Sequence, residues 1–320
     1  LQARRQADRY PHALLLQGPE GVGKRHFAKQ LAAALVCQSD AALEQQPCGN
    51  CHACHLAETG SHPDIQWITP EQPGKMIRVD AIRGLIGRSV LTSQGSASRT
   101  FLIDPADAMN VAAANSLLKT LEEPVASTRL ILISSRPHLL PATIRSRCQA
   151  LTFKPADADL AQRWLQQKLD SLEQVSQCLA LCGGAPLLAL RAAEEDWLAD
   201  AFQTLDDLQG LKTRQQHPLQ IAEQWSARPF DRLLEHLARI LADLAMLCAG
   251  IVQPRLFHPS ALARLQTLAE GLDLTRLLRF NDELNQLRRR AAYNLNASMS
   301  LEKMINDWLV STRPDRGGQG

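Results

Sequence analysis

The chain has 320 residues, 45% of them hydrophobic, which is enough for two or three domains with cores of their own. Its formal net charge is only +2, and this argues against a strongly basic nucleic-acid binder that works alone. Aromatic residues make up 4% while leucine and alanine are abundant, a composition that favours helices.

The sequence also predicts a cytoplasmic protein without a membrane-spanning segment. The longest apolar region, near 240–252, is interrupted by Asp243 and falls short of the roughly 18–20 residues that a span requires. The N-terminal stretch LQARRQADRY lacks the apolar centre of a secretion signal. We therefore expect the eight cysteines to be metal ligands or free thiols rather than disulfides.

The first half of the chain alternates apolar strands with helices, which is the pattern of parallel βαβ units. Helices are expected at 24–37, 79–90 and 108–123, with a short helical turn at 141–148. Strands are expected at 13–18, 64–69, 76–78, 100–107, 129–135 and 150–155.

Strands nearly vanish after residue 155, and the rest of the chain has helical spacing of apolar residues. We predict a parallel-sheet α/β domain over 1–156, a small helical domain over 157–204 and an all-α domain over 205–320. The clearest helical stripe lies in 230–248 and consists of Phe230, Leu233, Leu234, Leu237, Ile240, Leu241 and Leu244.

The stretch GPEGVGKR after the first predicted strand is one residue away from a phosphate-binding loop, G-x-x-x-x-G-K-[ST]. Its glycines Gly18, Gly21 and Gly23 would let backbone N–H groups point at phosphate oxygens, and Lys24 would face the terminal phosphates. The last position, which normally supplies a magnesium-binding hydroxyl, is Arg25. The alternative is a glycine turn that begins a helix without a ligand, so binding of ATP or ADP stays open.

The residues for hydrolysis are incomplete. Asp104 ends a predicted strand and fits the acid that contacts magnesium. Pro105 follows it where ATPases of this kind carry a glutamate, and proline cannot act as a base. Asp107 is better explained as a helix cap than as a replacement base, and Ser134 and Ser135 as strand-end hydroxyls rather than a phosphate sensor. Turnover of nucleotide is therefore not expected.

A cysteine cluster follows the first helix. Cys48, Cys51 and Cys54 have C-x2-C-x2-C spacing, and Cys37 lies upstream. Four thiolates can surround one Zn²⁺ tetrahedrally and form a closed, structural site. We therefore predict a zinc module within 37–62.

Other readings of the cysteine cluster are weaker. The histidines His52, His55 and His62 are alternative ligands. C-x-x-C-H occurs twice, but haem attachment would require an export signal and the two copies overlap. A bacterial iron–sulfur run would require a further cysteine at the position of Glu58. Free thiols remain as the last alternative.

Arg147 lies between Ser146 and Cys148, just before the last predicted strand. An arginine at such a surface position can reach ATP on a neighbouring subunit, and arginine fingers raise turnover by roughly 10³–10⁵. From the residues alone an ordinary surface or salt-bridged arginine is the stronger interpretation, and Arg145 is an equally basic neighbour.

Together these motifs resemble the clamp-loader subunits of bacterial DNA polymerase III. The resemblance is carried by HALLLQGPEGVGKR, the four cysteines, RVDAIR, FLIDPADAMNVAAANSLLKTLEEP and LPATIRSRC, and it is strongest over 12–155. It implies an AAA+ module, a small helical lid and a C-terminal helical collar that holds a five-subunit ring. The implied partners are the gamma or tau and delta subunits, and through the complex the sliding clamp and primed DNA.

Three positions depart from the motor subunits of that family: Arg25, Pro105, and Leu187, where the motors carry a lid arginine. With these departures the chain resembles the family member that does not hydrolyse ATP. That member offers the arginine of its SRC motif, here Arg147, to the adjacent motor. The resemblance also implies zinc on the four cysteines, although the spacing from Cys37 to Cys48 is longer than in the motors. The chain would then be part of the polymerase III holoenzyme, a nucleotidyltransferase. Two alternatives stay open: an active motor ATPase of the gamma/tau type, and a zinc-based interaction module without a role in ATP chemistry.

Overall fold

The structure is a computed structural model that describes residues 11–39, 47–72, 74–89, 99–125, 128–290 and 297–312. Predictions for the N-terminal stretch, for 40–46 within the cysteine-rich segment and for the C-terminal tail lie outside these residues. The chain divides into two compact units, Leu1–Pro155 and Ala156–Gly320, and each is described by itself.

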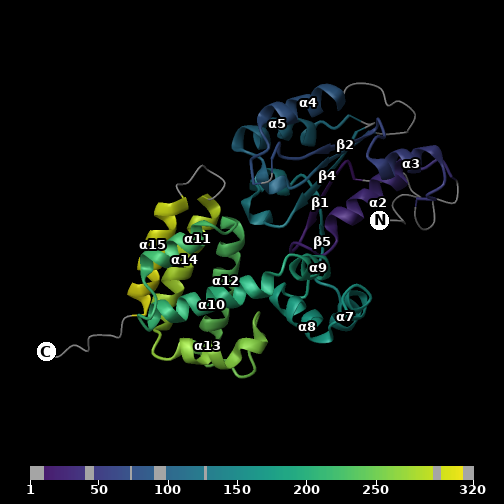
Figure 1. The fold of residues 1–320 in the computed structure, drawn as a ribbon. Coiled ribbons are helices and arrows are strands. Elements are labelled where there is room, and N and C mark those ends of the chain that lie inside the picture. The colour runs from purple at the N-terminus through teal and green to yellow at the C-terminus, as the bar shows by residue number, and fades with distance from the viewer. Residues whose placement is uncertain are drawn as a thin grey trace. The chain divides into compact units, whose positions relative to one another are not determined.

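The first unit is built on a five-stranded parallel sheet in the order β2-β3-β4-β1-β5 (Figure 1). Alternate side chains of β1 point to opposite faces, so Ala13 and Leu15 join one core and Leu14 and Leu16 the other. Side chains of β1, β3 and β4 are buried on both faces, as expected inside a parallel sheet covered by helices, whereas the edge strand β5 is largely exposed. The strands are β1 (Ala13–Gln17), β2 (Ile65–Ile68), β3 (Arg99–Ile103), β4 (Thr128–Ser134) and β5 (Gln149–Thr152).

Helices cover both faces of this sheet (Figure 1). One core includes Ala28 and Leu31 of α2, and the other includes Leu85 of α4 and Leu117 of α5. The predicted α/β parallel-sheet class is therefore confirmed. The helices are α2 (Lys24–Val36), α3 (His52–Thr59), α4 (Val79–Ser89), α5 (Val111–Glu122) and α6 (Ala142–Arg145).

Three local predictions differ most from the structure. The strand expected at 100–107 is β3, which ends at Ile103, and a short 3-10 helix occupies Ala106–Ala108. The strand expected at 76–78 is reduced to a single bridge between Ile77 and Met109. The helix expected from 108 begins only at Val111, because the Asn110 side chain accepts a hydrogen bond from the backbone N–H of Ala113 at 2.8 Å and so caps the helix. At the start of α5 a local side-chain cap thus decided where the helix begins.

The second unit is helical over its described residues. The predicted stripe of 230–248 is α12, and six of its seven apolar side chains are buried while Phe230 packs at the margin. Helices α7, α8 and α9 are Ala158–Gln166, Leu172–Leu181 and Pro186–Glu194. Helices α10 to α15 are Trp197–Lys212, Pro218–Ser226, Phe230–Cys248, Leu262–Ala269, Leu274–Arg290 and Ala297–Ser311.

The boundary predicted at 204–205 falls inside α10. Residues on both sides of it share one polar and aromatic cluster, in which Arg191 and Arg232 each stack on Trp197 at 5.0 Å. The Trp197 indole also donates to Glu195 at 3.0 Å. The division of this half of the chain into a lid and a collar stays a prediction.

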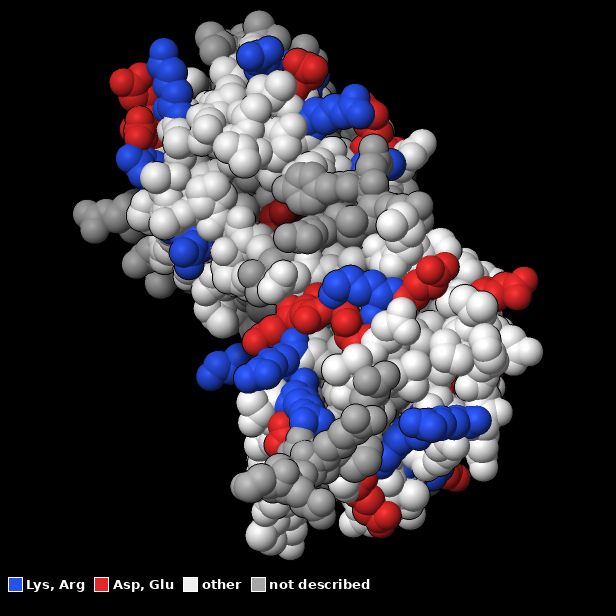
Figure 2. Space-filling view, turned by 90° about the vertical axis from the view of Figure 1, so that its left-hand side faces the viewer, with Lys and Arg blue, Asp and Glu red and all other residues white. Residues whose placement is uncertain are grey.

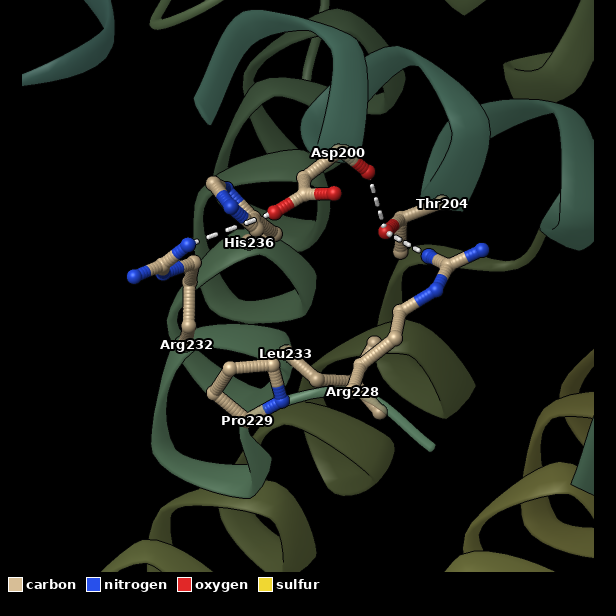
Figure 3. Close-up of a pocket in the computed structure, with 7 residues that line it drawn as sticks. All are labelled: Asp200, Thr204, Arg228, Pro229, Arg232, Leu233 and His236. Carbon is tan, nitrogen blue, oxygen red and sulfur yellow. Dashed lines mark hydrogen bonds and ion pairs between the residues drawn. The ribbon is translucent and has the colours of Figure 1, made fainter. Parts of the chain in front are cut away.

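A small pocket between α10 and α12 is lined by charged side chains (Figure 3). Its arginines are already neutralised, since Arg228 pairs with Asp207 at 3.2 Å and Arg232 with Asp200 at 3.5 Å. Burial, helped by nearby arginines, lowers the pKa of His236 to about 3, so this ring is neutral. The charges that line the pocket therefore neutralise one another, and we interpret it as a gap in side-chain packing rather than a ligand site.

Charge is also mixed on the molecular surface. Figure 2 shows Lys and Arg side chains interspersed with Asp and Glu on the face turned to the viewer. None of the described helices is long and apolar enough to cross a membrane alone, and the bent pair α8–α9 passes by length and composition only.

Gly18 should be indispensable to the first unit. A Cβ atom at this position would lie 2.2 Å from the Phe153 carbonyl oxygen, and the backbone φ is +145°. We expect Gly18→Ala to lower the free energy of unfolding by about 1–3 kcal/mol. Gly87→Ala is the matched control, because nothing lies within 4 Å of its added Cβ. Thermal melting of both variants checks this, and a Gly18→Ala protein as stable as the parent would contradict it.

Candidate functional site

The glycine-rich loop lies between β1 and α2, as the motif requires. Gly21 and Gly23 have φ values of +76° and +94°, a region that side-chain-bearing residues rarely adopt. Gly23 is the N-cap of α2, and the positive end of a helix with its free N–H groups favours an anion. The backbone shape of a phosphate-binding loop is therefore present.

Lys24 is held by its own loop. Its ammonium donates to the carbonyl oxygens of Gly18 at 2.7 Å and Pro19 at 2.5 Å, and to the Ser135 hydroxyl at 3.0 Å. The residue is only 5% exposed, and burial lowers its pKa against the opposing effect of nearby carboxylates. A phosphate would have to compete with these three bonds for the lysine.

Arg25 provides a cation beside Asp104, the acid that follows β3. Nη1 of Arg25 lies 3.4 Å from Oδ2 of Asp104, and the guanidinium stacks on the Trp67 ring at 5.0 Å. Burial raises the pKa of Asp104, while Arg25 and then Lys24 lower it. A buried carboxylate needs a compensating positive charge, and in this chain two side chains supply it.

Asp107 is fully engaged nearby. Its carboxylate accepts from the Ser134 hydroxyl at 2.6 Å, from the Ser135 N–H at 3.2 Å and from Arg136 Nε at 3.1 Å. The side chain is 2% exposed. Its position does not fit a water-activating base. It is also not the N-cap of α5 that the sequence suggested, because that cap is Asn110. Its hydrogen bonds instead join the segment after β3 to the end of β4.

Arg147 lies apart from these contacts, after α6. Its Nη2 forms an ion pair with Glu122 Oε1 at 2.6 Å, and its Nη1 donates to the Thr143 carbonyl at 3.0 Å. The side chain is 36% exposed. The partner of this arginine is thus a surface carboxylate at the end of α5.

The two residues flanking Arg147 fix its backbone. The Ser146 hydroxyl donates to the Thr143 carbonyl at 3.2 Å. Cys148 is buried in the same core as Ile144, and burial raises its pKa to about 12. Both neighbours of Arg147 are therefore engaged within their own chain, and their part in the site stays a prediction.

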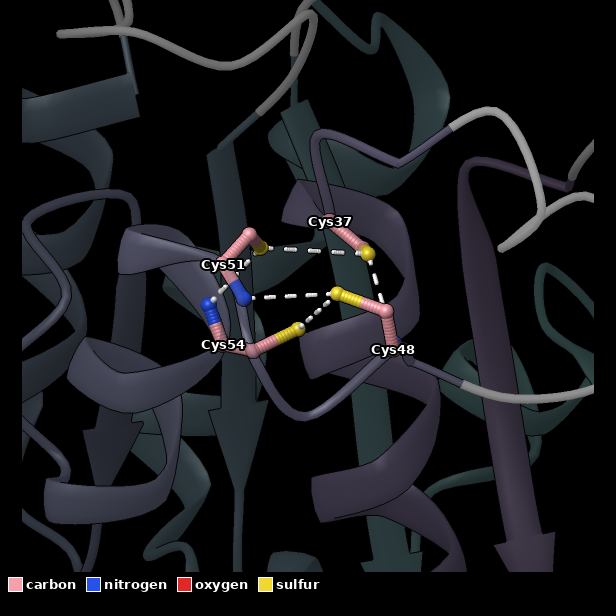
Figure 4. Close-up of side chains that lie close together, drawn as sticks. All are labelled: Cys37, Cys48, Cys51 and Cys54. Atoms are coloured by element: carbon pink, nitrogen blue, oxygen red, sulfur yellow. Dashed lines mark hydrogen bonds between the residues drawn. The ribbon is translucent and has the colours of Figure 1, made fainter.

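The four predicted cysteines come together (Figure 4). Their sulfur atoms all lie within 4.8 Å of one another, with 4.0 Å between Cys37 and Cys51 and 3.9 Å between Cys48 and Cys54. Four sulfurs at about 2.3 Å from a tetrahedral Zn²⁺ would be about 3.8 Å apart. The cluster therefore has the size and donor set of a Cys₄ metal site.

Backbone N–H groups favour the thiolate form of two of the four cysteines, Cys48 and Cys51. Hydrogen bonds from the backbone lower the pKa of Cys48, and such bonds lower that of Cys51 to about 6. Burial raises the pKa of Cys54 to about 12. The alternative ligands His52 and His55 are exposed, and His62 instead accepts the backbone N–H of Asp64 at 3.1 Å.

Three partners in these sites were not foreseen: Trp67 beside Arg25, Arg136 beside Asp107, and Glu122 beside Arg147. Each is separated from its partner by more than twenty residues in the sequence. Of these three partners, only Glu122 lies within a recognisable sequence motif, the LLKTLEEP stretch. Leu187, at the place of the lid arginine, is 41% exposed on α9.

A parallel sheet in the order β2-β3-β4-β1-β5, with a glycine loop after β1, an acid after β3 and helices that follow along the chain, is the arrangement of the AAA+ class of P-loop proteins. Family models described as "DNA polymerase III, delta subunit" and "DNA polymerase III, delta subunit, C terminal" match residues 1–157 and 195–309. The chain belongs to the clamp-loader family of DNA polymerase III delta-prime subunits.

Individual relatives support this assignment. The chain is 37% identical to the DNA polymerase III subunit delta-prime of Pseudomonas aeruginosa over 93% of its own length and 92% of the relative's. It is 30% identical to the delta-prime subunit of Haemophilus influenzae over 72% and 70%. A solved gamma subunit-related protein of Thermotoga maritima is similar over 98% and 99% of the two chains, with 16% identity and a TM-score of 0.41, too weak a likeness to argue from.

Replacement of Arg25 should create a magnesium site. Arg25→Thr removes the cation from Asp104 and adds the hydroxyl that the loop lacks. We expect this variant to bind ATP roughly tenfold or more tightly in Mg²⁺ than in EDTA, without turnover, because Pro105 remains. Arg25→Lys, which keeps the charge and adds no hydroxyl, is the control. Calorimetric titration measures both, and equal Mg²⁺-dependent binding by the unaltered chain would refute the prediction.

Proposed function

We propose that this chain is the non-hydrolysing subunit of its clamp loader and acts as a stator. The observation that carries the proposal is the Arg25–Asp104 ion pair, at 3.4 Å, in the place where a motor would hold magnesium. A guanidinium and Mg²⁺ cannot both neutralise the same carboxylate without repelling each other. The loop thus keeps the shape of a nucleotide site while its own cation takes the role of the metal.

The catalytic base is also missing. Pro105 has no group that could orient a water molecule, and the carboxylate of Asp107 already accepts three hydrogen bonds. Phosphoryl transfer depends on positioning and on cations that neutralise developing charge. In this proposal the described residues around the loop supply a cation, but neither a magnesium-binding hydroxyl nor a positioned base.

Arg147 would act on another subunit. It is partly exposed, and within the described part of the chain its side-chain partner is the exposed Glu122. An ion pair between exposed side chains is worth at most about 1 kcal/mol, so it can be exchanged for a phosphate. In this proposal Arg147 completes the ATP site of an adjacent gamma or tau motor, and the helical unit braces a five-subunit ring that loads the sliding clamp onto primed DNA.

Removal of the finger should silence one neighbouring site. In a loader reconstituted with the motor and delta subunits, we expect Arg147→Ala to lower ATP turnover at the adjacent site by roughly 10³-fold or more. Arg145→Ala is the control, because Arg145 is an exposed arginine at the end of α6. Clamp- and DNA-stimulated ATPase is measured, and unchanged turnover with Arg147→Ala would disprove the finger assignment.

The four cysteines would hold one structural Zn²⁺. Cys37 follows α2, and Cys51 and Cys54 begin α3, so a shared ion would tie these two helices together. The helices already share a small apolar cluster that includes Val36 and Ala53. Four cysteine ligands leave no open position, so the ion would supply rigidity rather than catalysis.

Loss of one ligand should release the metal. We expect purified protein to contain about one equivalent of zinc, and Cys51→Ser to contain much less and to melt at a lower temperature. Cys248→Ser is the control, because Cys248 lies in α12 outside the cluster. Metal analysis by plasma mass spectrometry reads the content, and zinc that Cys51→Ser leaves unchanged would undo the assignment.

A further inference from the structure

The guanidinium of Arg147 is held between two helices of its own chain. The Glu122 carboxylate, which takes one end, belongs to the last residue of α5, and the Thr143 carbonyl, which takes the other, belongs to α6. These contacts give the side chain a defined resting place. Any reach toward a neighbouring subunit must begin by breaking the contact with Glu122.

The position of Glu122 is unfavourable without a cation. The C-terminal end of a helix carries partial negative charge, so a carboxylate there is repelled. Glu122 occupies this end of α5, and its side chain is 49% exposed, so it does little for the core. The last turn of α5 also carries Lys119, but the ion pair that the structure gives Glu122 is with Arg147, and the two charges stabilise each other at the surface.

We propose that Glu122 is a positioning residue that competes with a neighbour's ATP phosphate for the guanidinium of Arg147. The inference rests on the proposed function, since only an arginine that acts outside its own subunit has to be released. When the adjacent site is empty, Glu122 keeps Arg147 against α6. When that site holds ATP, the phosphate oxygens offer a denser negative charge and take the guanidinium over.

The size of the two interactions makes the exchange practicable. An exposed ion pair shifts an equilibrium by no more than about fivefold. A finger at a transferring phosphoryl group is worth roughly 10³–10⁵ in turnover. Glu122 can therefore set where Arg147 rests, but it is too weak to prevent the transfer.

The test uses Glu122→Gln in the reconstituted loader. We expect kcat/KM for ATP at the adjacent site to rise about twofold to fivefold, because the competing charge is gone while the side-chain shape is kept. Glu123→Gln is the matched control: Glu123 is exposed and stands next along the chain, as the C-cap of α5. It should leave kcat/KM unchanged.

A double-mutant cycle separates competition from a general effect on the helix. If Glu122 acts through Arg147, Glu122→Gln must have no effect in the Arg147→Ala background. An unchanged or lowered kcat/KM for Glu122→Gln alone, or an equal rise in both backgrounds, would overturn the competition while leaving the finger intact. If Arg147→Ala itself leaves turnover unchanged, the proposed function fails first, and this inference fails with it.

Discussion

The pairing of Arg25 with Asp104 is the interaction on which the site depends. It places a side-chain cation 3.4 Å from a half-buried carboxylate that would otherwise require a metal ion. Lys24, one residue earlier, turns back to the carbonyls of Gly18 and Pro19. The loop is thus electrostatically complete without nucleotide or magnesium, and in our account this is why the fold of an ATPase serves as a fixed member of a ring.

The fold was largely predictable because its signals are local. The buried strands β1 and β4 and the stripe of α12 appear in the sequence as the apolar runs and periods that burial on two faces or one face requires. Among the predictions that differed, those at 76–78 and at the start of α5 concern short segments. There a single bridge or an Asn110 cap decided the conformation.

The sites were predictable only in part. The cysteine set could be read from spacing, and the structure brings all four sulfur atoms together. The partners of the charged residues could not, since Arg25 meets Trp67 and Arg147 meets Glu122 only after the sheet has formed. No pattern in the sequence states that Lys24 donates to its own loop or that Asp107 is saturated by β4 and its following residues. Such pairings depend on tertiary placement rather than on spacing.

ATP turnover during a titration of this chain into the motor subunits tests most directly whether the chain is a non-hydrolysing stator. We expect the chain alone, with Mg²⁺, to release no phosphate above background. We further expect turnover by the motors to rise as the chain is added and to stop rising when each ring holds one copy. Brisk turnover by the isolated chain, or motors whose rate does not respond to it, would contradict the account.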